Sequence, residues 1–330
     1  MNLITRHRIA FTSVAAGALI SATALRRGPS DPDLRNLSQF WSNKMTWHGA
    51  ADCVIAGDSR AGQGLVPSTL SEQLDGARVL NFAFDSGGYS EEYLRAIDNV
   101  LDEASPSPTI LLALTPYSLT PGAIRLNEFE HQRHLASSPL KVALADSLDR
   151  LQPMRVDRIG AELVGRRSKG PAQDRVWHAD GWVQVKREGG NERMYEQHYH
   201  ESFVDNRVSS EIVQNVARHV AAWSRRGVCV AVFRAPISAP IRAIEDACSG
   251  FDEPVIRKLL TEAGARWLDP AGLPYLTYDG SHLGGREAMR LTADLGAQLA
   301  KTRDQSRVVL NPVAGAPAQK SHVRAAMLAD

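Results

Sequence analysis

Short apolar runs alternate along the chain with longer segments in which apolar residues recur at helical spacing. Five runs have the length of a buried strand, at residues 53–56, 78–82, 109–114, 228–233 and 266–268. Apolar residues at intervals of three and four predict helices at about residues 90–103, 208–223, 253–263 and 285–300. Strands that alternate with helices are typical of βα units, whose strands pair in parallel. The pattern therefore predicts an α/β fold with a five-stranded parallel sheet.

The βα pattern stops at about residue 124 and resumes at about residue 207. We interpret residues 124–206 as an insertion that caps the sheet, within one domain spanning residues 28–302. The aromatic and histidine residues between Trp177 and Phe203 would line a substrate cleft or form the small core that such an insertion needs. Residues 303–330 are rich in Ala, Pro, Gln and Val without a clear period, which predicts a poorly ordered tail.

The first 27 residues differ from the rest of the chain. Basic residues flank an uncharged run at residues 9–25, which ends near Ala22-Thr23-Ala24. This layout is typical of a secretory signal peptide with an A-x-A cleavage site, or of a short membrane anchor. We expect an exported protein, periplasmic, extracellular or held at the membrane through residues 9–25. The alternative is an amphipathic N-terminal helix on a cytoplasmic protein.

Composition excludes several classes of function. Apolar residues make up 43% and charged residues 23% of the chain, as in ordinary globular proteins with a packed core. The formal net charge is +1, without the basic surface that binding to nucleic-acid phosphates requires, so no nucleic-acid partner is expected. The three cysteines show no metal-ligand spacing. We expect neither a metal nor an organic cofactor.

Gly57-Asp58-Ser59 directly follows the first predicted strand. Ser59 is therefore expected at the carboxyl end of a parallel strand, where open α/β sheets carry their reactive groups. A serine hydroxyl becomes a good nucleophile only when a base is within reach. The alternative interpretation is a serine that caps a helix after a strand.

A base for Ser59 is available after the fifth predicted strand, in Asp279-Gly280-Ser281-His282. In a tight loop, residues three apart can place a carboxylate against imidazole Nδ1. The carboxylate then fixes the tautomer and leaves Nε2 free to take a proton from serine. The alternative is a capping aspartate followed by an exposed loop histidine.

A glycine-containing segment, residues 81–88, ends the second predicted strand. Glycine lets backbone N–H groups approach a developing oxyanion without interference from a Cβ. Gly87 is our first choice as a donor and Gly88 the second. A plain turn between strand and helix is the alternative.

Together, the three segments resemble the SGNH (GDSL-type) hydrolase and acyltransferase superfamily. Its members carry a GDS block after the first strand, a glycine block after the second and a DxxH block near the C-terminus. Order and strand context match over about residues 52–300. The resemblance implies a flavodoxin-like three-layer α/β/α sandwich and a triad of Ser59, His282 and Asp279. It also implies an oxyanion hole formed by the backbone amides of Ser59 and Gly87 with a side chain.

Two positions depart from the pattern of the superfamily. The GDS serine is followed by Arg60 in place of Leu; Arg60 would steer an anionic or polar substrate, or simply be solvated. The third block, usually GxND, reads ALTPYS over residues 113–118, so the oxyanion asparagine is missing. Thr115, Ser118 or Asn127 would substitute for it.

Arg234 ends the fourth predicted strand. Because the carboxyl ends of parallel strands share one edge of the sheet, Arg234 is expected to face the site and contact substrate. The alternative is an ordinary arginine at a strand end.

A GDSR first block with an altered third block, behind an export signal, is more similar to SGNH-like proteins of bacterial envelope and polysaccharide O-acylation than to secreted lipases. This resemblance implies a serine esterase or O-acyltransferase acting through acyl-Ser59 on acyl esters, with a cell-envelope or extracellular polysaccharide as substrate. One alternative is a transferase that barely hydrolyses simple esters. Another is a non-catalytic scaffold or carbohydrate-binding subunit with a partner in an envelope complex, which the missing asparagine favours.

Overall fold

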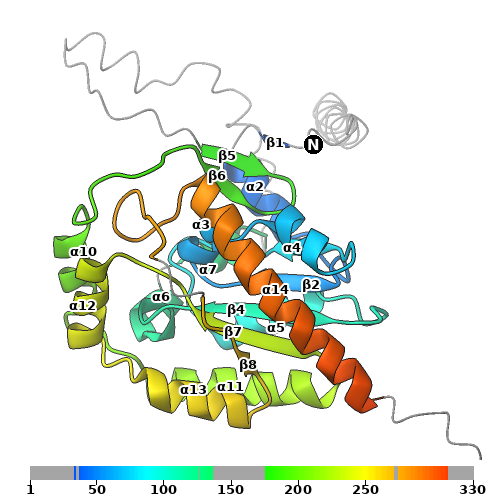
Figure 1. The fold of residues 1–330 in the computed structure, drawn as a ribbon. Helices are drawn as coiled ribbons and strands as arrows, with labels where there is room; N and C mark the ends of the chain where they lie inside the picture. The colour runs from blue at the N-terminus through cyan, green and yellow to red at the C-terminus, as the bar shows by residue number, and fades with distance from the viewer. Residues whose placement is uncertain (1–32, 35–36, 126, 137–174, 271–273, 311–330) are drawn as a thin grey trace, which may run out of the picture.

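A five-stranded parallel sheet forms the centre of the molecule (Figure 1). The computed structural model describes residues 33–34, 37–125, 127–136, 175–270 and 274–310. All neighbouring strands of the central sheet pair in parallel. In spatial order they are β3 (Val79–Asn81), β2 (Cys53–Ala56), β4 (Thr109–Leu114), β7 (Cys229–Arg234) and β8 (Arg266–Trp267). The predicted α/β fold and its five-stranded parallel sheet are confirmed.

Of the strands of the central sheet, β2 comes first along the chain, and it lies between the second (β3) and the third (β4). Cys53 of β2 pairs with Val79 on one side and with Thr109 on the other. This is the flavodoxin-like strand order, in which ligands bind beyond the carboxyl ends of the strands where the order changes direction. The segments after β2, β3 and β4 therefore meet at one edge of the sheet.

Successive strand residues point to opposite faces of the sheet. In β4, Ile110 and Leu112 belong to one hydrophobic cluster, and Leu111 and Ala113 belong to another on the opposite face. Every residue of β4 is buried. A parallel strand covered on both faces is apolar throughout, which explains the continuous run in the sequence.

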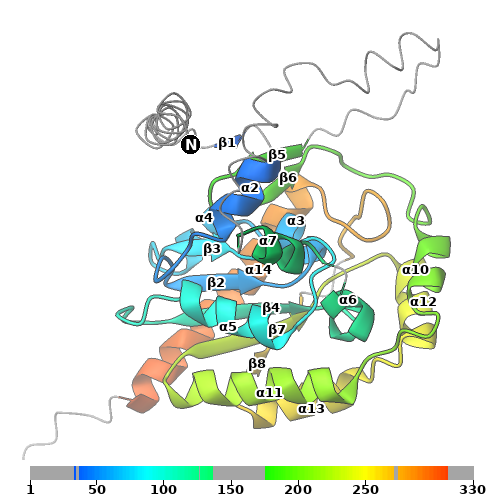
Figure 2. The same ribbon diagram turned by 180° about the vertical axis from the view of Figure 1, so that it is seen from behind.

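Helices cover both faces and complete the three-layer sandwich. The first face carries α5 (Glu91–Val100), α11 (Ser210–Arg225) and α13 (Glu253–Glu262). The second carries α3 (Ser59–Gly64), α4 (Pro67–Gln73) and α14 (Gly285–Leu310). Helix α14 crosses the side seen in Figure 1, and α5 lies on the side seen in Figure 2.

The last helix is longer than the sequence pattern indicates. We expected it to end near residue 300, with an irregular tail from residue 303, whereas α14 continues to Leu310. No glycine or proline interrupts the chain between Gly296 and Pro312. Because a proline disfavours helical conformation in the residue before it, Asn311 is the first position where the sequence opposes the helix. The remainder of the tail, residues 311–330, lies outside the described residues.

Small elements follow β4 and continue into the segment interpreted as an insertion, residues 124–206. The first are η1 (Tyr117–Leu119) and α6 (Pro121–Arg125), which begin before that segment, and α7 (Glu128–Ala136), which lies within it. Strands β5 (Arg175–His178) and β6 (Val183–Val185) form an antiparallel sheet with β1 (Asp33–Leu34).

Trp182 is buried, and its indole Nε1 donates to the carbonyl of Gln63 in α3 at 3.0 Å. Of the aromatic cluster, Trp182 and Phe203 are therefore core residues.

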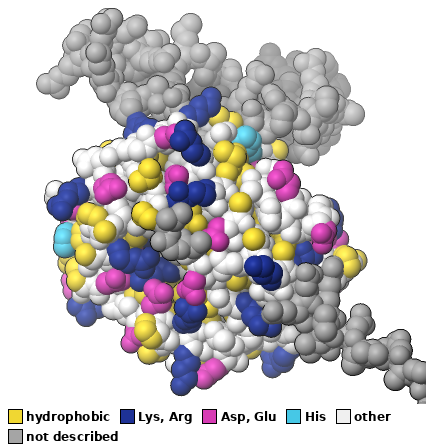
Figure 3. Space-filling view, viewed as in Figure 1, with side chains coloured by type: hydrophobic (Ala, Val, Ile, Leu, Met, Phe, Trp, Pro, Cys, Tyr) yellow, Lys and Arg dark blue, Asp and Glu magenta, His cyan; other side chains and the backbone are white. Residues whose placement is uncertain are grey.

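Three further helices complete the described part. Helix α2 (Leu37–Lys44) precedes the sheet, and α10 (Glu196–Ser202) packs beside α12 (Ala239–Cys248). The expected export segment, residues 1–27, and residues 137–174 of the insertion lie outside the described residues. Among the helices that are described, none combines the length and apolarity that a membrane span requires. On the face seen in Figure 3, basic and acidic side chains are interspersed.

Candidate active site

The chain turns sharply where β2 ends, and this turn presents Ser59. Gly57 has a φ of +153°, and a Cβ there would lie only 2.9 Å from the carbonyl oxygen of Ala113. Asp58 caps α3, because its Oδ1 accepts from the backbone N–H of Arg60 at 2.9 Å. Ser59 is the first residue of that helix. The interpretation of Ser59 as the cap is therefore wrong, since Asp58 performs that function.

The DxxH segment forms a tight loop between β8 and α14. Thr277 and Leu283 pair across it as an isolated antiparallel bridge. Inside the loop, Asp279 Oδ1 accepts from the backbone N–H groups of Ser281 at 2.9 Å and His282 at 2.8 Å. Gly280 has a φ of +94°, which glycine adopts without strain. The loop therefore folds the carboxylate back against its own histidine.

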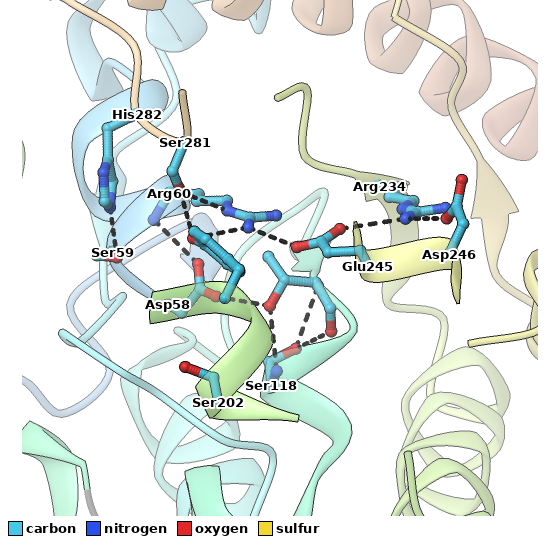
Figure 4. A network of polar contacts seen from close by, with 12 residues as sticks. Asp58, Ser59, Arg60, Ser118, Ser202, Arg234, Glu245, Asp246, Ser281 and His282 are labelled. Atoms are coloured by element: carbon cyan, nitrogen blue, oxygen red, sulfur yellow. Dashed lines mark hydrogen bonds and ion pairs between the residues drawn. The ribbon is translucent and has the colours of Figure 1, made fainter. Parts of the chain in front are cut away.

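The structure brings Ser59, His282 and Asp279 together. Ser59 and His282 meet across more than two hundred positions of sequence (Figure 4). Ser59 Oγ lies 2.8 Å from His282 Nε2. His282 Nδ1 lies 2.8 Å from Asp279 Oδ2. The His282 side chain is 17% exposed and that of Asp279 is 3% exposed. The arrangement is a hydrogen-bonded chain that runs from a buried carboxylate through a half-buried imidazole to a serine hydroxyl.

The charge state of Asp279 determines the direction of these hydrogen bonds. Burial would raise the pKa of its carboxyl group, but the hydrogen bond and charge of His282 outweigh burial and leave that pKa lowered. An ionised carboxylate only accepts hydrogen bonds, so Nδ1 of His282 donates to it. In a neutral ring Nε2 then carries the lone pair that faces the Ser59 hydroxyl. Ser59 therefore lies against a base that can remove its proton.

In the glycine block, residues 81–88, the backbone N–H group that is free to donate a hydrogen bond is not the one that we expected. The backbone N–H of Gly87 donates to the carbonyl of Phe84 at 3.0 Å, so our first choice as oxyanion donor is already bonded. A Cβ at Gly87 would lie 2.9 Å from the carbonyl oxygen of Gly57, so this glycine serves the close approach of two backbones. The N–H groups of Gly88 and Ser59 donate to no group within the described residues. These two amides are the available donors.

All three substitutes that we considered for the oxyanion asparagine have other partners. Ser118 Oγ donates to the carbonyl of Thr115 at 2.8 Å. Thr115 Oγ1 donates to Asp58 Oδ2 at 2.6 Å and accepts from the N–H of Ser118 at 3.1 Å. Asn127 Oδ1 accepts from the N–H of Glu130 at 2.9 Å, and its amide donates to two backbone carbonyls of α6. Thr115 therefore supports Asp58, and Asn127 fixes the start of α7. None of the three side chains therefore has a free donor to offer.

Both candidate arginines are buried in ion pairs, which corrects their expected roles. Arg60 is 6% exposed, and its Nη2 lies 2.5 Å from Glu245 Oε1. Arg234 is 7% exposed and pairs with the other oxygen of Glu245 at 3.1 Å, as well as with Asp246 and Glu253. Burial opposes a charged guanidinium, but the carboxylates raise the pKa of both arginines. Arg60 is therefore neither solvated nor a free substrate ligand, and Arg234 belongs to the same network (Figure 4).

A buried lysine lies beneath the glycine block. Lys44 of α2 is 1% exposed, and its Nζ donates to the carbonyl of Ala83 at 2.6 Å. The ammonium also lies over the rings of Phe40 and Trp41, 4.6 and 5.1 Å from their centroids. Burial lowers the pKa of Lys44 to about 7, although nearby Asp85 and Asp180 act in the opposite direction. No feature of the sequence pattern distinguished this lysine.

Sequence reasoning also missed Tyr199, Ser281 and Glu245, which surround Arg60. Tyr199 belongs to the aromatic cluster of the insertion, but its partners depend on tertiary contacts. Within the described ranges, no group of His, Cys, Asp and Glu side chains could hold a metal ion. Comparison of the chain with protein-family models, curated proteins and solved structures gave no match.

Proposed function

We propose that the protein is a serine esterase or O-acyltransferase that works through an acyl-Ser59 intermediate. The observation that carries this proposal is the hydrogen-bonded chain from Asp279 through His282 to Ser59, with 2.8 Å at each of its two side-chain contacts. A capping or structural serine has no need of an imidazole oriented by a buried carboxylate. A nucleophilic serine requires both.

In the proposed reaction, Ser59 Oγ attacks the carbonyl carbon of an acyl ester while His282 Nε2 takes the hydroxyl proton. The tetrahedral intermediate collapses, the carbon–oxygen bond to the leaving alcohol breaks, and His282 returns the proton to that alcohol. Water or a sugar hydroxyl then gives a proton to His282 and attacks the acyl-serine carbonyl. The bond from that carbon to Ser59 Oγ breaks, His282 returns the proton to Ser59 Oγ, and the acid or a new ester is released. Asp279 holds the imidazole in the required tautomer throughout.

The oxyanion that forms on the substrate carbonyl requires hydrogen-bond donors. We assign this role to the free backbone N–H groups of Ser59 and Gly88. A Cβ at Gly88 would lie 2.6 Å from the carbonyl carbon of Ala123, so the backbone of the glycine block must approach α6 closely at this position. Loss of one oxyanion donor typically lowers kcat by a factor of about 10² to 10³.

The order of the blocks on a flavodoxin-like sheet supports assignment to the SGNH superfamily. We extend the proposal to ester-linked acyl groups of a cell-envelope or extracellular polysaccharide, which would be reached through export directed by residues 1–27. Mass spectrometry of O-acetylated glycans incubated with and without the protein tests this substrate class. A change in acyl content that requires Ser59 would support it.

Hydrolysis of p-nitrophenyl acetate tests the chemistry independently of the natural acceptor. The Ser59→Ala variant should lose activity while its circular dichroism stays that of the wild type. Ser202→Ala is a matched control, because the Ser202 hydroxyl donates only to the exposed backbone of its own helix. An undiminished rate in Ser59→Ala would overturn the proposal.

A non-catalytic carbohydrate-binding role is the second candidate, and one observation favours it. Thr115 and Asn127 are both committed to other partners, so neither supplies a side-chain donor to the oxyanion hole. On this alternative the protein would bind polysaccharide with equal affinity in its wild-type and Ser59→Ala forms and turn over no ester. Calorimetric titration with de-acylated and acylated glycans distinguishes the two.

A further inference from the structure

The Arg60 side chain connects three segments that are distant in sequence. Its Nε donates to Ser281 Oγ at 3.1 Å, and its Nη2 donates to the Tyr199 hydroxyl at 2.9 Å. The Tyr199 hydroxyl and Ser281 Oγ are themselves 2.5 Å apart. Arg60 follows the proposed nucleophile, Ser281 precedes His282, and Tyr199 comes from α10 of the insertion. Together they form a closed triangle of polar contacts behind the reacting pair.

Glu245 neutralises the guanidinium of this triangle. Its carboxylate is fully buried and accepts from Arg60 at 2.5 Å. A charge-assisted hydrogen bond of this kind fixes the plane of the guanidinium, because the five N–H donors of arginine have a rigid geometry. Glu245 of α12 therefore sets the orientation in which Arg60 Nε donates to Ser281.

The backbone of the insertion also lies directly on the DxxH loop. A Cβ at Gly280 would lie 2.3 Å from the carbonyl oxygen of Glu192, and one at Gly284 would lie 2.1 Å from that of Arg187. In the opposite direction, a Cβ at Gly190 would lie 1.7 Å from the carbonyl oxygen of Tyr278. Only glycine allows these close approaches. Residues 187–192 therefore lie directly against the loop that carries His282. Tyr199, a little further along the insertion, contacts the same loop through Ser281.

We propose that Tyr199, through its hydroxyl contacts with Arg60 and Ser281, is a positioning residue by which the insertion holds His282 against Ser59. This inference rests on the proposed function of the same site. Because a displacement of about 1 Å at a reacting pair can cost a factor of about 10² in rate, loosening one contact of the triangle is expected to slow acylation. We place no substrate atom in contact with Arg60, Tyr199 or Ser281, so KM should be unaffected.

The test uses Tyr199→Phe and Ser281→Ala, which remove one hydroxyl each. Arg60 is left intact because its removal would leave Glu245 buried without a partner, which is strongly destabilising. Tyr195→Phe is the matched control, since the Tyr195 hydroxyl makes no hydrogen bond within the described part of the chain. Steady-state hydrolysis of p-nitrophenyl acetate and the rate of acyl-enzyme formation are measured for all three variants and for Ser59→Ala.

We expect kcat and the acylation rate to fall about tenfold or more in Tyr199→Phe and Ser281→Ala. KM should stay within about twofold of the wild-type value, and Tyr195→Phe should behave as the wild type. A residue that merely stabilises the fold would lower the melting temperature and leave kcat of the folded protein unchanged. Wild-type kcat in both variants, or an effect confined to KM, overturns the inference while the proposed function stands. Wild-type activity in Ser59→Ala overturns the proposed function itself.

Discussion

Replacing Lys44 by Met should change how the stability of the protein depends on pH. Lys44 is fully buried beneath the glycine block, and burial lowers its pKa from the usual 10.5 to about 7. A difference of this size corresponds to roughly 5 kcal/mol of unfavourable free energy for the charged form in the native state. Met has a similar shape and carries no charge, so it removes this cost.

The sign of the effect follows from proton binding. Between about pH 7 and about pH 10.5 the unfolded chain keeps the Lys44 proton while the native state has lost it. The unfolded state then binds more protons, so the free energy of unfolding rises with pH. The destabilisation caused by Lys44 is complete below about pH 7 and disappears above about pH 10.5. From about pH 6 to about pH 9 the free energy of unfolding of the wild type should therefore rise by about 2.5 kcal/mol relative to that of Lys44→Met.

Urea unfolding followed by tryptophan fluorescence at several pH values measures this difference. Loss of the Lys44 hydrogen bond leaves the carbonyl of Ala83 unsatisfied, which costs about 1 to 3 kcal/mol but does not vary with pH. Lys258→Met is the matched control, because the Lys258 side chain is 77% exposed. A difference between wild type and Lys44→Met that stays flat within about 0.5 kcal/mol across this range would refute a lysine neutralised by burial.

Three further substitutions test the local geometry. Asp279→Asn should lower kcat by about four orders of magnitude with the fold intact, because the amide no longer holds His282 in the required tautomer; a loss below about tenfold would contradict this. Gly87→Ala should lower the free energy of unfolding, measured in urea, by about 1 to 3 kcal/mol, because the added Cβ would lie 2.9 Å from the Gly57 carbonyl oxygen. Unchanged stability would show that the glycine block can shift to make room for the Cβ. Ser90→Ala should cost about 1 kcal/mol, since Ser90 Oγ caps α5 by accepting from Tyr93 N–H; an unchanged unfolding midpoint would contradict this.

The sequence predicted the fold well because its signals are local. Strands covered on both faces appear as continuous apolar runs, so β2 and β4 were located at their observed bounds. The start of α5 was also predictable, since Ser90 followed by two glutamates is a local capping signal. The juxtaposition of Ser59 and His282 followed from topology, because the strand order brings their loops to one edge of the sheet.

The environment of the site was not predictable in the same way. Gly87 and Gly88 are adjacent and chemically identical, and only the turn that bonds Gly87 to Phe84 distinguishes the free amide from the bonded one. Arg60 was expected at the surface or at a substrate, because its buried partner Glu245 lies on a helix far along the chain. Likewise, the pKa of Lys44 depends on packing that no local pattern encodes.

A covalent adduct at Ser59 would test the central claim most directly. The protein is treated with a fluorophosphonate, which reacts with activated serine hydroxyls, and the modified peptide is identified by mass spectrometry. We predict one adduct, on Ser59, that forms readily in the wild type and is almost absent when His282 is replaced by Ala. Failure of Ser59 to react, or equal labelling with and without His282, would contradict an activated nucleophile at this site.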